Sequence, residues 1–202
     1  MAAMLEVPRP RTRASPLFIV AMGVSAVVVV VAARIFPALA DENHTLENLQ
    51  VALLLCAAAG QVWRAERIRG EQEYQRTLAV LLAFLCLACA LRELDIDRLG
   101  ARAFFEPFET TLRALTLGSI ATYVYTRFRA VLLLLREPRA TLQDPVGRLT
   151  IAGVVLYCLS WPLDKKLAPL GERASLLLEE WLELWACASF FLAACVRPRT
   201  GG

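Results

Sequence analysis

The apolar residues of this chain are gathered into six blocks that charged segments separate. The blocks are residues 16–36, 46–62, 78–91, 110–125, 149–163 and 176–196. A helix needs about 20 apolar residues to cross about 30 Å of hydrocarbon, and the first and last blocks have this length. The four shorter blocks reach it only if flanking polar residues enter the span. We therefore predict an all-α membrane protein, a bundle of six transmembrane helices.

A single membrane domain accounts for almost the whole chain. The sequence is 57% hydrophobic, above the roughly one-half that is usual in soluble domains. No linker or low-complexity stretch is long enough to divide it. We expect a basic cytoplasmic N-terminus at residues 1–15, the six-helix domain at 16–196, and a cytoplasmic tail at 197–202.

The basic residues favour one orientation of these helices. With Arg9, Arg11 and Arg13 in the cytoplasm, 14 of the 22 Lys and Arg residues lie inside and 13 of the 19 Asp and Glu residues outside. This is the positive-inside pattern, so both termini are predicted in the cytoplasm. The inner arginines are spread over four separate segments, which argues against nucleic-acid binding. The expected partner is the lipid bilayer, and we assume a bacterial cytoplasmic (inner) membrane from the size and the lack of eukaryotic targeting signals.

The first block has a second interpretation. The basic residues 9–13, the apolar run from Leu17, and Ala38-Leu39-Ala40 before Asp41 resemble a signal peptide with its cleavage site. The run from Leu17 to Ala33 is longer than a usual signal-peptide core and can span, which favours a retained helix. Asp41 lies outside in both cases.

Local signals predict the ends and faces of several helices. Asp144 before Pro145 is typical of an N-cap followed by proline at the first helical position. Residues 130–135 continue the fourth helix or form a separate interfacial piece. In the second helix, Gln50, Leu54 and Gln61 share one face with small residues alongside, so this face is predicted to point into the bundle.

Acidic side chains collect at the outer ends of the predicted helices. Glu183 is two turns inside the last helix, with Glu179 and Glu180 one turn before it, where like charges repel. Glu93 lies near the C-terminal end of its helix, where the helix dipole disfavours an anion. Such acids at membrane depth need cations, shared protons or a metal. The candidate substrate- or ion-binding residues are Glu47, Glu93, Asp95, Glu179, Glu180 and Glu183.

Two interpretations of this acidic group stay open. In the first, cations at the same level pair with the acids and stabilise helix packing. In the second, the acids line an outward-facing cavity that binds a cation, exchanges protons or positions a polar headgroup. The predicted charge-pairing cations are Arg92, Arg113, Lys165 and Lys166.

The leading functional hypothesis is a transporter, or a component of one, that handles a cation, protons or a cationic solute. One alternative is an enzyme acting on a lipid-linked or periplasmic headgroup through paired carboxylates or an oxygen-ligated divalent metal. The other is a non-catalytic assembly subunit. No catalytic residue is assigned and no cofactor is required by the leading hypothesis. A homo-oligomer or a membrane partner stays open.

Other chemistries are disfavoured by the residues present. Cys86 and Cys89 have CxxC spacing, but they lie in the C-terminal half of an apolar helix, whereas reactive pairs lie at a helix N-terminus. His44 is the single histidine, and di-iron and intramembrane zinc sites mostly need two or more. An all-oxygen site for Mg²⁺, Mn²⁺ or Ca²⁺ stays chemically feasible. Its ligands would be Glu47, Glu93, Glu180 and Glu183.

Overall fold

All regular structure in the described part of the chain is helical, as predicted. The computed structural model describes residues 44–68, 73–94, 102–136, 138–165 and 172–196. These ranges contain seven helices: α3 (His44–Arg67), α4 (Glu73–Glu93), α5 (Arg102–Thr126), α6 (Phe128–Arg136), α7 (Pro138–Gln143), α8 (Pro145–Asp164) and α9 (Glu172–Cys195). The expected first helix, the signal-peptide alternative and the terminal segments 1–15 and 197–202 lie outside the described residues.

Three of the described helices are long and apolar enough to cross a membrane, by length and composition. They are the segments Leu46–Arg67 of α3, Glu73–Glu93 of α4 and Pro145–Leu163 of α8. Helix α9 is as long, at 24 residues, but Glu179, Glu180 and Glu183 lower its apolar character. The described residues therefore support membrane integration for three helices.

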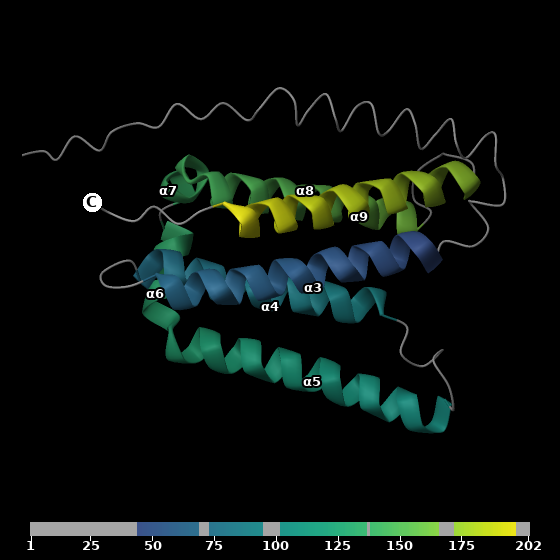
Figure 1. Ribbon diagram of the computed structural model, residues 1–202, viewed down its shortest axis with the longest axis horizontal. Helices are drawn as coiled ribbons and strands as arrows, with labels where there is room; N and C mark the ends of the chain where they lie inside the picture. Colours follow the sequence, from purple (N-terminus) through teal and green to yellow (C-terminus); the bar gives the residue numbers. More distant parts are fainter. Residues whose placement is uncertain (1–43, 69–72, 95–101, 137, 166–171, 197–202) are drawn as a thin grey trace, which may run out of the picture.

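Helices α3, α4, α8 and α9 form the core of the fold (Figure 1). Helix α3 packs against both α4 and α9, and α8 packs along α9. Gln50 meets Glu180 near the starts of α3 and α9, and Arg64 reaches Val196 near their ends. These two helices therefore run parallel to each other.

Small residues allow the core helices to approach closely. A Cβ atom added to Gly60 on α3 would lie 2.9 Å from the Cβ of Ala194 on α9. A Cβ atom added to Gly153 on α8 would lie 2.6 Å from the ring of Phe190 on α9. Close contact between backbones is the usual way in which helices associate within lipid, where little hydrophobic driving force exists.

The interior of the bundle is apolar along most of its length. The largest buried cluster draws residues from all four core helices: Leu54, Ala57, Cys86, Cys89, Ala90, Leu156, Ala186, Cys187 and Phe190. The predicted inner face of α3 is buried as expected, with Gln50, Leu54 and Gln61 no more than 1% exposed. Cys86 and Cys89 are free thiols inside this cluster, which fits the reading of both as small core residues.

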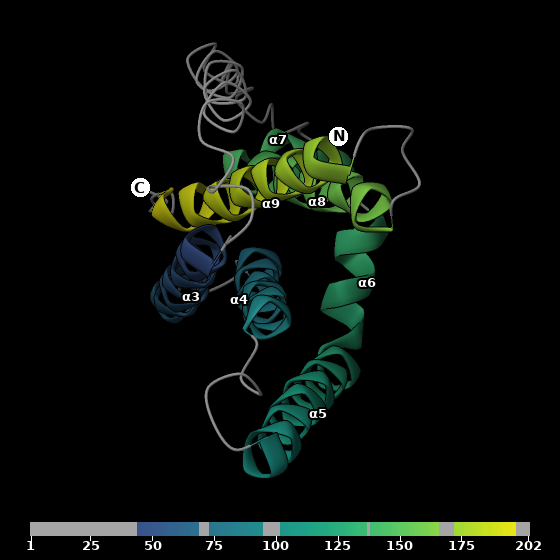
Figure 2. The same ribbon diagram turned by 90° about the vertical axis from the view of Figure 1, so that its right-hand side faces the viewer.

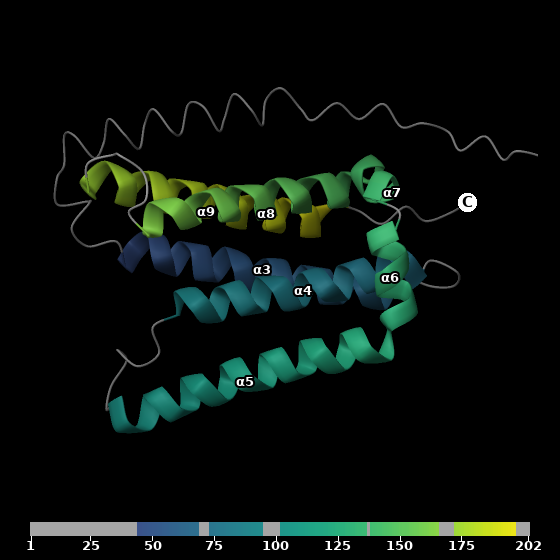
Figure 3. The same ribbon diagram turned by 180° about the vertical axis from the view of Figure 1, so that it is seen from behind.

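The segment from α5 to α7 extends from this core on one side. Helix α5 packs on α4 and diverges from α8 and α9, and α6 bridges back toward α7 (Figures 2 and 3). Residues 130–135, predicted either to continue the fourth helix or to form a separate piece, belong to a separate helix, α6. The Oδ1 atom of Asp144 accepts a hydrogen bond from the Val146 N–H at 3.2 Å, which confirms the N-cap of α8.

Candidate functional site

One end of the bundle collects polar side chains from four helices. We call this group the carboxylate cluster. Helix α3 contributes from its second turn, α4 from its last turn, α8 from its last two turns, and α9 from its third and fourth turns. The members are Gln50, Arg92, Glu93, Tyr157, Ser160, Glu180 and Glu183.

Glu183 is the most enclosed acid of the carboxylate cluster, at 3% exposed. Its Oε1 atom accepts hydrogen bonds from Nη2 of Arg92 at 2.7 Å and from Oγ of Ser160 at 2.9 Å. Ser160 is fully buried, and its single hydroxyl hydrogen is shared between Glu183 and the main-chain carbonyl of Tyr157, which lies 2.8 Å from Oγ. The Glu183 carboxylate is therefore held by a charge-assisted bond and a hydroxyl, as a buried anion requires.

Arg92 bridges two acids. Besides Glu183, its guanidinium lies with Nε 3.2 Å from Oε1 of Glu93. Tyr157 donates its hydroxyl to the same Glu93 oxygen at 2.7 Å, and the Arg92 Cζ lies 4.8 Å from the centre of the Tyr157 ring. The side chain of Arg92 is 45% exposed, whereas those of Glu93 and Glu183 are 10% and 4% exposed. Arg92 is thus the accessible part of this ion-pair network.

Glu180 is held by a neutral side chain instead of a cation. The Nε2 atom of Gln50 donates to Oε2 of Glu180 at 2.9 Å and to its main-chain carbonyl at 3.3 Å. This geometry aims the amide nitrogen at Glu180 and leaves the amide oxygen facing elsewhere. Gln50 is fully buried, and its Oε1 atom has no hydrogen-bond partner within the described residues. A buried acceptor without a donor is costly, so a water or a ligand is expected to supply the missing hydrogen or charge.

Other acidic side chains of the described residues lie near Glu180. Glu47, Glu93 and Glu183 all lie close enough for their charges to act on Glu180. The ion pairs of Arg92 go to Glu93 and Glu183. Glu180 is thus contacted by Gln50, whereas Glu93 and Glu183 are contacted by Arg92.

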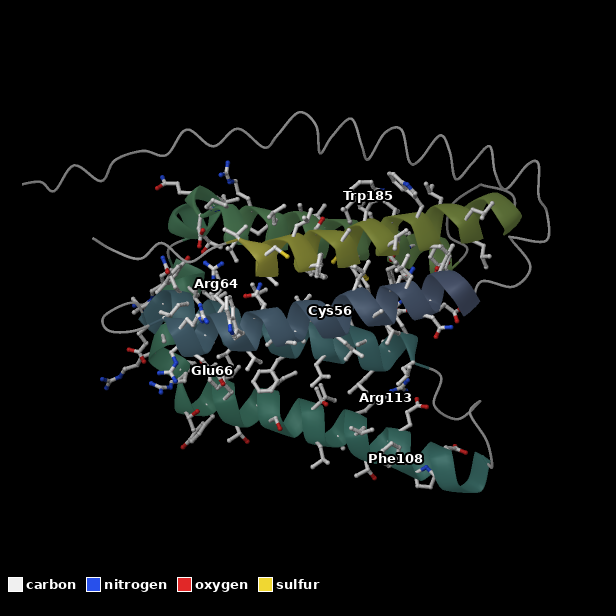
Figure 4. All side chains as sticks on the ribbon, in the orientation of Figure 1. Cys56, Arg64, Glu66, Phe108, Arg113 and Trp185 are labelled. Carbon is white, nitrogen blue, oxygen red and sulfur yellow. The ribbon has the colours of Figure 1, made fainter. Side chains whose placement is uncertain are left out.

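The predicted cations behave differently from one another. Arg113 pairs with Glu109 on its own helix, with 2.6 Å between Nη2 and Oε1, and donates to the Leu91 carbonyl at 3.3 Å. It therefore ties α5 to the end of α4. Figure 4 shows Arg113 near the end of the molecule opposite Arg64. Lys165 is exposed just after α8.

The remaining predicted site residues are less well defined. Glu47 is half-buried in the first turn of α3, and Glu179 is half-buried one residue before Glu180 in α9. Asp95 and Lys166 lie outside the described residues. Among the residues that the structure describes, no three His, Cys, Asp or Glu side chains are grouped to hold one metal ion. The oxygen-ligated metal site accordingly stays a prediction.

Three members of the cluster were not among the candidates predicted from the sequence: Gln50, Tyr157 and Ser160. Gln50 lies one helical turn after Glu47, and Tyr157 and Ser160 lie one turn apart near the end of α8. A search for polar residues at three-residue spacing near the outer ends of the apolar blocks would have found them. These three side chains are neutral, so the pattern of charges along the chain does not indicate them.

Comparisons of the chain with protein-family models, with curated proteins and with solved structures find no match. The geometry of the carboxylate cluster is therefore the main indication of function.

Proposed function

We propose that this protein is a six-span membrane protein of the bacterial cytoplasmic membrane, with both termini inside. Its carboxylate cluster lies in the outer half of the bundle and binds a cation, protons or a cationic solute. The protein acts as a transporter or as a component of one.

The arrangement of charges along the bundle supports this orientation. The carboxylate cluster gathers at one end, and Arg64, Arg67 and Arg127 lie in the last turns of α3 and after α5 at the other end. Figure 4 shows Arg64 and Glu66 at this second end. Basic residues at one end of a set of apolar helices are typical of the cytoplasmic side.

The pairing of Glu180 with Gln50 carries the functional proposal. An acid in the span that is held by an amide, next to other acids and a buried oxygen without a donor, is suited to take up a positive ligand. Protons and cations bind such groups because they relieve the repulsion and satisfy the oxygen atoms.

The ion pairs of Arg92 support a structural role for part of the cluster. Glu93 and Glu183 share this arginine, as expected of a network that stabilises helix packing. The ligand-binding role is therefore assigned to Glu180, and Glu183 and Glu93 position Arg92. An assembly subunit without a ligand would need only the ion pairs of Arg92 with Glu93 and Glu183.

One observation favours the enzyme alternative. The Arg92 side chain is 45% exposed while its two acids are buried, so the accessible atoms of the network are cationic. An anionic lipid-linked headgroup would bind such a group. Stabilisation by a headgroup analogue such as glycerol phosphate, lost on replacing Arg92 with Gln, would favour this alternative over the cation site.

The test is ligand-dependent thermal stability of the full-length protein in detergent. Unfolding temperatures would be measured in Na⁺ and K⁺ against N-methylglucamine at constant ionic strength, and across a pH series. A ligand at 100 times its dissociation constant stabilises the folded state by about 2.7 kcal/mol. We expect such a shift for Na⁺, K⁺ or protons.

The variant Glu180→Gln should lose that shift because the amide keeps the hydrogen bond to Gln50 but cannot take a proton or balance a cation. The matched control is Glu66→Gln, an exposed acid at the opposite end of α3, which should keep the shift. The proposal is wrong if no ion or pH stabilises the native protein, or if Glu180→Gln responds as the native protein does.

A further inference from the structure

Helix α6 lies crosswise at the basic end of the bundle. Figures 1 and 2 show it running across the directions of α4 and α5, from the end of α5 toward α7. It packs against α4, and Ala130 faces inward at 8% exposed. A short helix at this place lies along the membrane surface if the long helices cross the membrane, a premise that rests on the proposed function.

The exposed side of α6 has two stripes of different chemistry. Phe128 and Leu135 are 59% and 73% exposed, and Arg129 and Arg136 are also exposed. Each pair is separated by seven residues, or about two helical turns, so its members lie one above the other. The two stripes are offset by one residue and hence by about 100° around the helix. Leu133, 54% exposed, lies about 50° beyond the arginines, so apolar side chains border the arginine stripe on both sides.

The two stripes match the two layers of a membrane surface, which are the boundary of the acyl chains and the headgroup phosphates. Large apolar side chains on a surface helix enter the boundary of the acyl chains, and arginines beside them reach the phosphates. Arg127, just before α6, pairs at 2.8 Å with Glu73 at the start of α4, so Arg129 and Arg136 are the cationic side chains that α6 itself presents. Juxtamembrane basic groups of this kind attract anionic lipids.

We infer that α6 is an interfacial helix that binds anionic phospholipids of the inner leaflet. Phe128 and Leu135 enter the acyl-chain boundary, and Arg129 and Arg136 contact the headgroup phosphates. This binding anchors the connection between α5 and α8.

The headgroup contact is tested by titrating phosphatidylglycerol or phosphatidylcholine into the full-length protein in detergent and following its unfolding temperature. We expect phosphatidylglycerol to stabilise the native protein more than phosphatidylcholine. The double variant Arg129→Gln/Arg136→Gln should need roughly 25-fold more phosphatidylglycerol for the same shift, because each arginine contributes about fivefold in affinity.

The matched control is Arg67→Gln/Arg76→Gln, which removes the same charge from α3 and α4 and leaves the sequence of α6 unchanged. It should shift the titration much less than the α6 variant. Equal effects of the two double variants would mean a diffuse charge effect and would overturn the inference, as would equal stabilisation by the two lipids.

The depth of α6 is tested with a fluorescent label at Leu135→Cys, after the exposed native thiols have been replaced by alanine (Cys56, Cys158 and Cys195). The protein is reconstituted in vesicles that contain a quencher either near the headgroups or near the chain ends. The label at residue 135 should be quenched mainly from the headgroup region, and a label at Leu117→Cys in the middle of α5 mainly from the chain ends.

The two labels test separately whether α6 is an interfacial helix and whether the long helices cross the membrane. A label at residue 135 that neither quencher reaches overturns the interfacial helix, provided that residue 117 is quenched. An unquenched label at residue 117 means that α5 does not span, and both the six-span proposal and the inference then fail.

Discussion

Two arginines at opposite ends of the bundle show how the chain accommodates buried charge. Arg92 shares its guanidinium between Glu93 and Glu183. Arg64 is 4% exposed and donates from Nη1 to the main-chain carbonyl of Val196 at 2.8 Å, just after the end of α9. A cation at a helix C-terminus satisfies free carbonyls and interacts favourably with the helix dipole. Arg92 thus links acidic side chains, and Arg64 satisfies a free main-chain carbonyl at the end of α9.

Replacing Glu183 with Gln should lower stability. A fully buried ion pair that loses one partner costs roughly 3–5 kcal/mol. The Arg92 side chain is 45% exposed and keeps Glu93, so we expect less, roughly 1–3 kcal/mol, as for a hydrogen bond to a charged group. Thermal unfolding in detergent measures the loss.

A double-mutant cycle shows whether this loss comes from the ion pair. The variants are Glu183→Gln, Arg92→Gln and the combination, and a coupling energy of at least about 1 kcal/mol is expected for direct partners. Unchanged stability in Glu183→Gln, together with loss of the ion-dependent shift, would make Glu183 a ligand-binding residue and contradict the structural role.

At the scale of helices, two glycines differ in how much space surrounds them. A Cβ atom on Gly147 in the first turn of α8 would collide with the main-chain oxygen of Thr141 in α7. Gly118 in the middle of α5 has no atom within 4 Å of such a Cβ. The corner between α7 and α8 therefore requires glycine, whereas α5 does not.

We expect opposite effects from the same substitution at these positions. Gly147→Ala should destabilise the protein by about 1–3 kcal/mol because a backbone atom must move. Gly118→Ala should stabilise it by about 0.5–1 kcal/mol because alanine restricts the unfolded chain and favours the helix. Thermal unfolding of the two variants gives the comparison, and a destabilised Gly118→Ala would show that another surface covers this side of α5.

At the scale of the whole molecule, the predicted topology has a direct test. Reporter fusions after Arg69, Asp97, Arg139, Glu172 and Arg199 should alternate between cytoplasmic and external activity, with the ends of the series inside. The physical reason is the excess of Lys and Arg in the inner segments. External activity at Arg69 or Arg139 would contradict the six-span orientation.

The sequence predicted the helices well because their signals are local. Helices α3, α4, α8 and α9 each coincide with an apolar block, and Asp144 with Pro145 marks the start of α8 as an N-cap. For residues 130–135 the sequence left open whether they continue the fourth helix or form a separate piece. The structure has a separate helix, whose crosswise direction depends on packing against α4. An apolar block shows that a segment is buried or lies in lipid. It does not show in which direction the helix runs relative to its neighbours.

The sequence by itself determined which residue types lie at each end of the bundle, since apolar block lengths and flanking charges decide where a helix enters and leaves a membrane. Only the tertiary structure decided that Arg92 pairs with Glu93 and Glu183, that Arg113 pairs with Glu109, and that Gln50 holds Glu180. Partner choice depends on the rotation of each helix about its axis. Contacts such as Gly60 with Ala194 set that rotation, and they join residues far apart in the chain.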